Sequence, residues 1–299
     1  MPTHDRASQT LPSEKLATGR PRFSVVIPAY NEASFLGNCL DSLFNQDFRG
    51  RYEIIVVDNN STDGTAAVAS SRGVKVVHEP RPGVCSARQR GTELAEGEII
   101  VSTDADTVFT GDWLSRIDQA FSADPALVAV AGPCRFVDPP WWGRVYTWIL
   151  FHIVGLIAQV TGRVLYVTAT NIAFRKRAWP GYDVEATQGG DELDLLRRLR
   201  ARGRVAFDLG NPTLTSSRRL HRGLAYNILV TCLYYYVLGY AVNRVTGRPL
   251  VGMAPAFRTG QRSQHKVRHT ARRIARLSVG VAFCLMFGDL ALRLVEAAW

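Results

Sequence analysis

Two aspartates stand two positions apart, directly after an apolar run of the sequence. Residues 98–103 read EIIVST, and Asp104 and Asp106 follow with only Ala105 between them. In an extended segment, residues i and i+2 face the same side, so the two carboxylates would repel unless a positive charge lay between them. Carboxylate oxygens are hard ligands that suit Mg²⁺ or Mn²⁺. The pair predicts a divalent-metal site completed by substrate phosphates, the alternative being a solvated acidic turn before a helix that begins near Asp112.

A second polar group follows another apolar run. Asp58 ends the segment IIVVD, and Asn59, Asn60 and Ser61 come next. A carboxylate at this position could accept a hydrogen bond from a nucleotide base or a ribose hydroxyl. An Asx turn with Ser61 capping the next helix is the other interpretation, and both can hold together. The sequence contains neither GxGxxG after the first predicted strand nor GxxxxGK[ST], which counts against NAD binding and a P-loop.

Short β-branched runs alternate with segments of helical periodicity in this part of the chain. Such alternation with short links predicts a parallel sheet with helices on both faces, and apolar strands are typical of a sheet buried on both sides. The predicted strands are 23–28, 52–58, 74–79 and 98–103, and the predicted helices are 31–46, 61–72 and 83–97, the last closed by Gly97.

Polar residues follow three of these strands at the same edge of the predicted sheet. Segments 28–32, 58–63 and 104–106 each begin where a strand ends. Ligands bind beyond the carboxyl ends of the strands in sheets of this kind, so the three segments should be neighbours around one ligand. This convergence is the strongest indication of a site that the residues themselves provide.

Composition narrows the class of partner and the compartment. The chain has 299 residues, of which 46% are hydrophobic, and a formal net charge of +10, which favours anionic partners such as nucleotides, phosphates or anionic lipid. Five scattered cysteines without a CxxC pair argue against a disulfide framework and a zinc knuckle, and they fit a reducing cytoplasm. Residues 1–21 are polar and lack the apolar core of a signal peptide, so we expect a disordered tail there.

Four motifs in order along the chain resemble those of the family-2 glycosyltransferases. They read FSVVIPAYNEASFLGNCLDSLFNQ, YEIIVVDNNSTDGT, GVCSARQRGTELAEGEIIVSTDADT, and TNIAFRK with the later GGDELDLLRRLRARG. The resemblance covers about residues 23–215. It implies an α/β fold of the GT-A type, with a Rossmann-like, mostly parallel sheet flanked by helices, and an inverting enzyme that uses a nucleotide-sugar donor. We expect the catalytic domain over 22–220 and a helical, membrane-associated region over 221–299.

The resemblance also implies roles for single residues. Asp58 would hydrogen-bond the base, and Asp104 would contact the ribose or the metal-bound phosphate. Asp106 would bind the divalent metal, Mg²⁺ or Mn²⁺. The nucleotide pocket would be lined by Pro28, Ala29, Tyr30 and Glu32 above the segment that holds Arg88, and an acceptor-side loop would hold Thr170 and Asn171.

The catalytic base would come from the stretch GGDELDL at 189–195. Counting back from Asp194 places Glu192 at the usual base position of the family, with Asp191 one step earlier. The family usually shows Glu-Asp, and the reversed order here leaves open which carboxylate takes the proton. An ordinary acidic start of a helix, complementing the macrodipole, is the alternative.

A basic segment near the end of the predicted domain reads SSRRLHRG. In the implied reaction a carboxylate takes the proton of the acceptor hydroxyl, and charge builds on the departing nucleoside diphosphate, where a metal stabilises it. Arg218, Arg219 and His221 could add positive charge at that diphosphate. A solvated basic turn is the alternative.

Three further apolar stretches bear on membrane association. The stretch 145–160 lies inside the predicted domain and is short for a membrane span, and 277–299 is interrupted by Asp289 and Arg293. A span at 224–242 would place the basic connector 243–276 outside, against the positive-inside tendency, so we expect an interfacial or re-entrant helix at the cytoplasmic face. Core helices or an oligomer interface are the alternative.

We interpret the chain as a metal-dependent glycosyltransferase that uses a UDP- or GDP-sugar and a lipid-linked or cell-envelope glycan acceptor. A nucleotidyltransferase also uses an Asp pair, but it would need a Gly-rich, basic loop after the first strand, where this chain has PAYNEAS. A non-catalytic nucleotide-sugar or lipid-binding module would tolerate loss of the carboxylates at 191 and 192, which are present. A nucleic-acid binder is least favoured, because the basic residues cluster beside apolar helices and not on a stacking platform.

Overall fold

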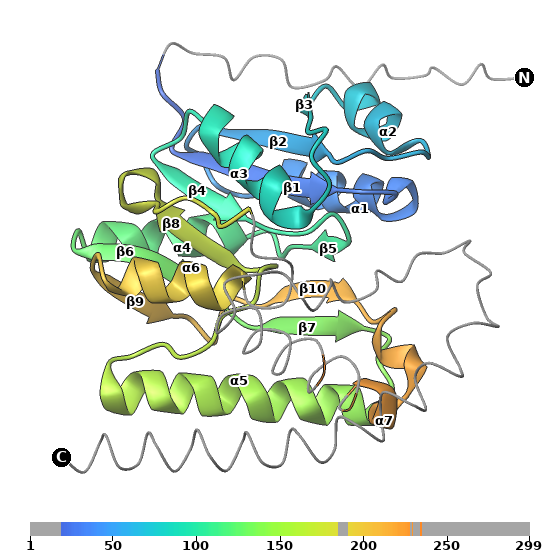
Figure 1. The fold of residues 1–299 in the computed structure, drawn as a ribbon. Coiled ribbons are helices and arrows are strands. Elements are labelled where there is room, and N and C mark those ends of the chain that lie inside the picture. The colour runs from blue at the N-terminus through green and yellow to red at the C-terminus, as the bar shows by residue number, and fades with distance from the viewer. Residues whose placement is uncertain (1–18, 185–190, 228, 230–233, 235–299) are drawn as a thin grey trace, which may run out of the picture.

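A computed structural model of the chain describes residues 19–184, 191–227, 229 and 234 (Figure 1). Most of the predicted tail over 1–21 therefore lies outside the described residues. The same holds for most of the predicted membrane-associated region over 221–299, including the apolar stretch at its end.

Seven strands form the main sheet in the order β3-β2-β1-β4-β8-β6-β9. Only β8 runs antiparallel, and it does so to both of its neighbours. The predicted mostly parallel α/β sheet is therefore confirmed. The strands are β1 (Phe23–Ala29), β2 (Tyr52–Asp58), β3 (Lys75–His78), β4 (Ile99–Ser102), β6 (Leu127–Ala131), β8 (Ile172–Arg175) and β9 (Arg204–Phe207).

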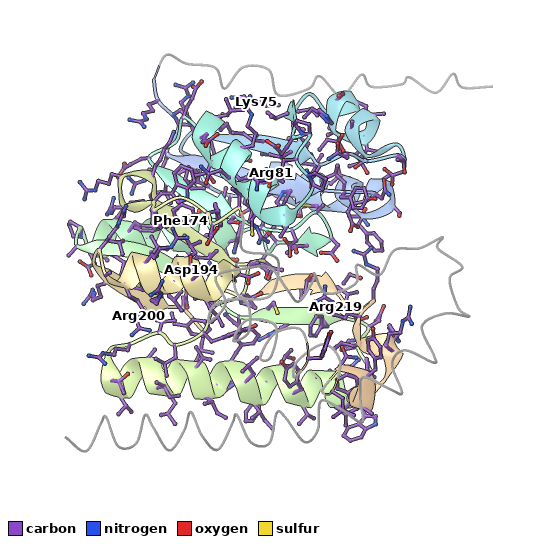
Figure 2. The ribbon with its side chains drawn as sticks, viewed as in Figure 1. Lys75, Arg81, Phe174, Asp194, Arg200 and Arg219 are labelled. Carbon is purple, nitrogen blue, oxygen red and sulfur yellow. The ribbon has the colours of Figure 1, made fainter. Side chains whose placement is uncertain are left out.

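Helices cover both faces of this sheet (Figure 1). One face carries α1 (Ala33–Phe44), α2 (Thr65–Ser71) and α4 (Trp113–Ala123), and the other carries α3 (Val84–Leu94), α5 (Trp141–Thr161) and α6 (Asp191–Arg200). Strand β1 supplies Val25 and Ile27 to the first core and Val26 to the second, as strand alternation requires. Figure 2 shows Phe174 of β8 on the side of the sheet that faces α6. Burial on both faces explains why the strands read as continuous apolar runs.

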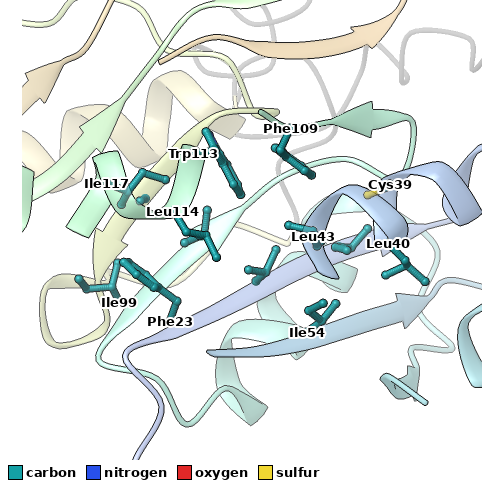
Figure 3. Close-up of a cluster of buried hydrophobic side chains, with 14 of the residues drawn as sticks. Phe23, Cys39, Leu40, Leu43, Ile54, Ile99, Phe109, Trp113, Leu114 and Ile117 are labelled. Carbon is teal, nitrogen blue, oxygen red and sulfur yellow. The ribbon is translucent and has the colours of Figure 1, made fainter. Parts of the chain in front are cut away.

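The core under α1 and α4 fixes the loops at the strand ends (Figure 3). Leu40 and Leu43 of α1 and Trp113 and Leu114 of α4 are completely buried. The ring of Phe109 stacks on Trp113 with 4.0 Å between centroids. Burying a large apolar side chain stabilises a fold by roughly 1.5–3 kcal/mol. Because α1 begins shortly after β1 and α4 shortly after β4, this packing holds both connecting loops in place.

A smaller sheet brings distant parts of the chain to the same edge. Its strands are β5 (Thr107–Val108), β10 (Thr213–Ser216) and β7 (Cys134–Val137), in the order β5-β10-β7. Strand β5 follows the two aspartates directly and pairs antiparallel with β10. The short helical turns η3 (Leu220–Arg222) and α7 (Leu224–Tyr226) follow β10, and η2 (Lys176–Ala178) follows β8.

Two predicted helix boundaries are wrong. The helix predicted to close at Gly97 ends at Leu94, and Gly97 has another purpose: a Cβ there would lie 2.6 Å from the backbone nitrogen of Ser24, so only glycine permits this close approach. The helix predicted from 61 begins at Thr65. Ser61 does not cap it, since its hydroxyl accepts a hydrogen bond from the Asn31 N–H at 3.0 Å.

Helix α5 is longer than the apolar stretch 145–160 predicts. It has 21 residues and is long and apolar enough to cross a membrane by length and composition. The prediction that this stretch is too short is therefore corrected. One side of the helix packs on the domain, however: Phe151 and Val154 are buried, and the Phe151 ring lies 6.2 Å from that of Phe207.

Candidate active site

Three polar loops meet at one edge of the main sheet. Ala29 at the end of β1 pairs in register with Asp58 at the end of β2, and Asp58 pairs with His78 at the end of β3. Strand β4 lies on the other side of β1 and leads into the two aspartates. Because these strands are parallel, their carboxyl ends share one edge, and the predicted convergence is confirmed.

Arg88 neutralises the first aspartate of the pair. Its Nη2 donates to Asp104 Oδ1 at 2.8 Å, and its Nη1 lies 3.8 Å from Glu192 Oε1. The arginine is 3% exposed, whereas a third of the Asp104 side chain remains accessible. A planar guanidinium stays charged when buried and can serve two carboxylates at once. Arg88 therefore joins the strand-end aspartate to the acidic start of α6.

Arg218 neutralises the second aspartate. Its Nη2 donates to Asp106 Oδ2 at 2.7 Å and to Glu32 Oε1 at 3.0 Å, and its guanidinium stacks 4.3 Å over the Phe35 ring. Burial alone would lower the pKa of Arg218, but the hydrogen bonds and charges of the two carboxylates outweigh it and raise that pKa. The Thr215 hydroxyl donates to Asp106 Oδ1 at 3.3 Å. Strand β10 and the turn after it thus supply the partners of an aspartate more than a hundred positions earlier.

The backbone around the aspartate pair is a turn, and the predicted extended segment is wrong. The Thr107 N–H donates to the Asp104 carbonyl at 3.3 Å, and Ala105 and Asp106 form the tip. The two carboxylates accordingly bind two different arginines. The repulsion expected between them is offset by one cation for each carboxylate.

Asp58 is buried, with its two oxygens in separate contacts. The Ser61 N–H donates to Oδ1 at 3.3 Å, three residues along the chain and not the two of the predicted Asx turn, and His78 Nδ1 lies 3.7 Å from Oδ2. Next to it, the Asn59 side chain holds the loop after β3 through the carbonyls of Glu79 and Arg81 at 2.9 and 2.7 Å. The loop that would receive a nucleotide base is therefore internally braced.

The predicted nucleotide-pocket residues of the first loop differ in exposure. Pro28 and Ala29 are buried at the end of β1, and Tyr30 is 40% exposed. Glu32 lies at the N-terminal end of α1 and shares Arg218 with the second aspartate. Only Tyr30 of this group therefore presents a large side chain to solvent for stacking.

The predicted acceptor-side residues are buried in the fold. Thr170 is 7% and Asn171 3% exposed. The Asn171 amide donates to the carbonyls of Pro133 and Asn211 at 3.0 and 2.8 Å and accepts from the Trp113 indole at 3.0 Å. These contacts make Asn171 a connector between elements, and the role in acceptor binding stays a prediction.

The other predicted residues lie on two flanking elements. Asp191 and Glu192 begin α6, whose last turn carries arginines, so its charge distribution complements the macrodipole as the alternative interpretation expects. The His221 Nε2 lies 3.1 Å from the Ser217 hydroxyl at the turn after β10. Figure 2 shows Arg219 near the same turn, beyond the end of β10.

The residues at this edge fit a divalent cation only in part. Asp104 and Asp106 are hard oxygen donors on one turn, the kind of ligand that Mg²⁺ and Mn²⁺ prefer. No group of three or more His, Cys, Asp or Glu side chains able to hold a metal occurs among the residues that the structure describes. A cation held here would therefore take part of its coordination from donor phosphates, as the sequence predicts.

Two contributors to the site escaped the sequence reasoning. Thr215 and Phe35 both contact the charged pair of Asp106 and Arg218. Phe35 reads as an ordinary core position of an amphipathic helix, and Thr215 sits in a short strand with no motif of its own. Only the alternation in TLTS, with Thr213 and Thr215 on one side, could have drawn attention to Thr215.

Sequence comparison decides the family. The profile described as "Glycosyl transferase family 2" matches residues 24–179, more than half of the chain. This chain belongs to glycosyl transferase family 2. The resemblance read from the four motifs is therefore confirmed, and Arg88, Asp104 and Asp106 lie within the matched residues.

Two curated relatives match part of this glycosyltransferase chain. Glycosyltransferase AglE of Haloferax volcanii is 34% identical over 126 residues, which are 40% of this chain and 41% of that protein. The uncharacterized glycosyltransferase Rv0539 of Mycobacterium tuberculosis is 34% identical over 128 residues, 42% of this chain and 56% of that one. The chain thus matches about half of the length of these relatives.

Solved structures share the fold at low identity. The mannosyltransferase PcManGT of Pyrobaculum calidifontis, in complex with GDP-Man and Mn²⁺, has a TM-score of 0.61 at 22% identity and covers 93% of this chain and 81% of its own. The S. aureus protein TarS 1-349, in complex with UDP-GlcNAc, has a TM-score of 0.51 at 17% identity and covers 66% of this chain and 59% of its own. At these identities the likeness establishes the fold alone.

Proposed function

We propose that this chain is a metal-dependent, inverting glycosyltransferase that moves a sugar from a nucleotide-sugar donor to a hydroxyl group. The observation that supports it best is the shared edge where Asp58 and the aspartate pair meet Glu192 through the buried Arg88. The carboxylate of Glu192 on α6 lies beside the sheet edge proposed to bind the nucleotide, and it could serve as the base that takes the proton of the acceptor. This arrangement serves transfer chemistry better than binding alone.

The donor side of the proposed reaction uses the three strand-end loops. Asp58 would accept a hydrogen bond from the base, and Tyr30 would pack on the nucleotide beside Pro28 and Ala29. Asp104 and Asp106 would hold Mg²⁺ or Mn²⁺, which when bound neutralises the departing diphosphate. Arg218 would add its own positive charge there once Asp106 turns toward the metal. GDP-Man and Mn²⁺ in the PcManGT complex and UDP-GlcNAc in the TarS complex support a nucleotide-sugar donor of the UDP or GDP type.

The acceptor side depends on the start of α6. Glu192 would take the proton from the acceptor hydroxyl as its oxygen attacks the anomeric carbon from the face opposite the leaving diphosphate, so that a single displacement inverts that centre. Arg88, 3.8 Å away, would keep Glu192 ionised and oriented. Asp191 is the second candidate for the base.

The acceptor is proposed to be a lipid-linked or cell-envelope glycan at the cytoplasmic face of a membrane. The length and apolar character of α5 and the net charge of +10 support a membrane surface as the site of the proposed reaction. Thr170 and Asn171 would then shape the acceptor side from beneath and not by direct contact.

The reaction class is tested by screening UDP- and GDP-sugars with the full chain in detergent, with Mg²⁺, with Mn²⁺ and with EDTA. We expect hydrolysis or transfer from one donor class, abolished by EDTA and reduced about 100-fold or more in Asp106→Asn. The absence of turnover and of binding with every donor would overturn the proposal.

The base is assigned by comparing Glu192→Gln with Asp191→Asn. Loss of the base should lower kcat by about 100- to 10,000-fold while leaving the donor KM within a fewfold. We expect this from Glu192→Gln and a much smaller change from Asp191→Asn. Full activity in both variants would contradict the mechanism.

A further inference from the structure

Helix α5 presents an apolar face that the fold of the domain does not use. One side, with Phe151 and Val154, is buried against the sheet. The opposite side exposes large apolar side chains at helical spacing along the whole length of the helix. We call this set the α5 stripe: Trp141, Val145, Trp148, Ile149, Ile153, Leu156 and Val160, exposed by between 45% and 77%.

The stripe is free of negative charge. Helix α5 contains no Asp or Glu, and Arg144 is its one residue with a full charge at neutral pH. Its 21 residues extend over about 31 Å at 1.5 Å per residue. The two exposed tryptophans sit in the first half of the helix, and tryptophan favours the boundary between headgroups and acyl chains.

A cluster of arginines lies where α5 ends. A cavity of about 440 Å³ is lined by residues that directly follow the helix and by the adjoining parts of α6 and β9. Figure 2 shows Arg200 between α6 and the end of α5. We call the four basic side chains of this cavity the arginine pocket: Arg163, Arg197, Arg200 and Arg204.

Two of the four arginines form ion pairs, and the other two have no carboxylate partner among the described residues. Arg197 forms an ion pair with Asp194 at 3.1 Å, and Arg204 pairs with Asp124. Arg200 instead donates to the Val164 carbonyl at 3.4 Å. No ion pair joins Arg163 or Arg200 to an acid within the part of the chain that the structure describes. The pocket therefore keeps positive charge beside the end of the apolar stripe.

We infer that the α5 stripe lies in the surface of an anionic membrane, with the arginine pocket binding a lipid phosphate. An exposed apolar face, boundary tryptophans on that face and a cluster of cations where its helix ends match the chemistry of an acidic lipid surface. The buried side of α5 keeps the helix along the membrane plane: a Cβ at Gly155 would lie 2.4 Å from the Leu209 side chain, so helix and domain are in close contact. This inference rests on the proposed function for its purpose, since it would present the domain to a lipid-linked acceptor.

The contact is tested on the full chain by placing a photo-crosslinker in the stripe, Leu156→p-benzoylphenylalanine. With vesicles of phosphatidylcholine and phosphatidylglycerol, we expect a lipid adduct on the peptide that holds position 156. The matched control is Gln119→p-benzoylphenylalanine, an exposed position on α4 on the opposite face of the sheet, and it should give no adduct. A crosslink from 156 to a peptide of residues 235–299, or to a second copy, overturns the inference, and so does equal lipid labelling at both positions.

The pocket is tested by Arg163→Ala/Arg200→Ala in vesicle co-sedimentation. Each arginine near an anionic surface is worth about fivefold in binding, so the double variant should bind acidic vesicles about 25-fold more weakly and neutral vesicles unchanged. Arg49→Ala/Arg116→Ala removes the same charge elsewhere and should have a smaller effect. Equal losses of vesicle binding in the two double variants would mean that net charge alone, and not the pocket, sets the affinity. That result would contradict the inference.

Donor turnover measured in detergent separates this inference from the proposed function. The pocket variant should retain it, because none of its residues lies at the strand-end site. A lipid adduct without turnover of any donor would support the membrane contact and contradict the proposed reaction. Donor turnover without a lipid adduct would support the proposed reaction and contradict the membrane contact.

Discussion

Arg218 holds the charge balance on one side of the strand-end site. Its guanidinium donates hydrogen bonds to Asp106 and Glu32 and packs on the Phe35 ring. It therefore takes the position beside the Asp106 carboxylate that a bound metal cation would need. A metal bound to Asp106, as proposed, would therefore compete with Arg218 for that carboxylate. Once its hydrogen bond to Asp106 is broken, Arg218 would be free to stabilise the negative charge of the donor diphosphate.

Removal of this cation should move two affinities in opposite directions. In Arg218→Ala we expect Mn²⁺ to bind several-fold more tightly, because its competitor is gone, and the donor KM to rise about tenfold, because one charge-assisted hydrogen bond is lost. Isothermal titration with Mn²⁺ and donor-saturation kinetics measure the two effects.

Arg218→Lys is the control, because it keeps the charge while losing the planar fork. It should show the same signs with smaller amplitude. Weaker Mn²⁺ binding in Arg218→Ala would mean that Arg218 shapes the metal site and does not compete with it.

At the scale of elements, α3 carries Arg88 to the site by lying unusually close to the sheet. A Cβ at Gly91 would lie 2.4 Å from a methyl of Val26 and 2.8 Å from one of Val57. Arg88 is one turn earlier on the same helix. The position of its guanidinium between Asp104 and α6 therefore depends on the glycine that permits the contact.

Gly91→Ala should damage both stability and activity. The added methyl forces α3 away from the sheet, at a cost of about 1–3 kcal/mol in the free energy of unfolding, and shifts Arg88 with it. Urea unfolding and donor kinetics measure the two effects.

Gly64→Ala is the matched control, because its Cβ would meet only Ala33 at 3.9 Å and its φ of −75° suits alanine. It should be near neutral in both measurements. Equal effects of the two substitutions would contradict the packing argument.

Asp63 ties the first two helices together through a charged acceptor. It accepts hydrogen bonds from the Thr65 N–H at 2.9 Å, from the Thr65 hydroxyl and from the Ala33 N–H at 3.2 Å. Burial alone would raise the pKa of Asp63, but these hydrogen bonds outweigh it and lower that pKa below 3.8. Its contribution to stability is therefore present above pH 3.8 and is lost as the pH falls through the lowered value.

Asp63→Asn should cost about 1 kcal/mol of unfolding free energy at pH 7. The difference from the natural chain should shrink as the pH falls below 3.8, because the unfolded chain takes up the proton first and the folded chain only at the lowered pKa. Urea unfolding at pH 7 and pH 3 checks the sign. A difference that grows at low pH would show that the charge of Asp63 is not what stabilises the loop.

At the scale of the whole molecule, two cores enclose the sheet and bury three thiols. Cys39, Cys85 and Cys134 are all free and buried. Loss of solvation, aided by nearby carboxylates, raises the pKa of Cys39, and loss of solvation raises the pKa of Cys134 to about 12. The thiols of Cys39 and Cys134 therefore resist ionisation in the folded chain, and Cys85 is shielded by its burial.

Their alkylation should therefore report global unfolding. We expect iodoacetamide to label the three positions at one common low rate in native buffer, and together at the urea midpoint. Peptide mapping by mass spectrometry distinguishes them from the two other cysteines. Labelling of Cys39 well before the other two would instead reveal local opening beside the Asp104 turn, whose carbonyl its thiol contacts at 3.7 Å.

The sequence by itself determined the first four strands of the main sheet, the helices between them, the family and the loops that follow those strands. Strands buried on both faces read as apolar runs, and polar residues interrupt them only where each strand ends, so strand ends and loop convergence follow from local pattern and the rule for parallel sheets. Helix ends were less accurate. Gly97 reads as a helix stop, yet it is there because two backbones approach closely, and such contacts leave no local trace.

Only the tertiary structure decided how the site is charged and which surface remains apolar. Arg88 reaches the aspartates from α3, and Thr215 and Arg218 reach them from β10 and the turn after it, because α3 packs under β1 and β2 and β5 pairs with β10. The two faces of α5 likewise look alike in sequence, and packing alone separates Phe151 inside from Leu156 outside. Spacing along the chain predicts which residues share a strand or helix, whereas ion pairs and exposed faces depend on how those elements meet in space.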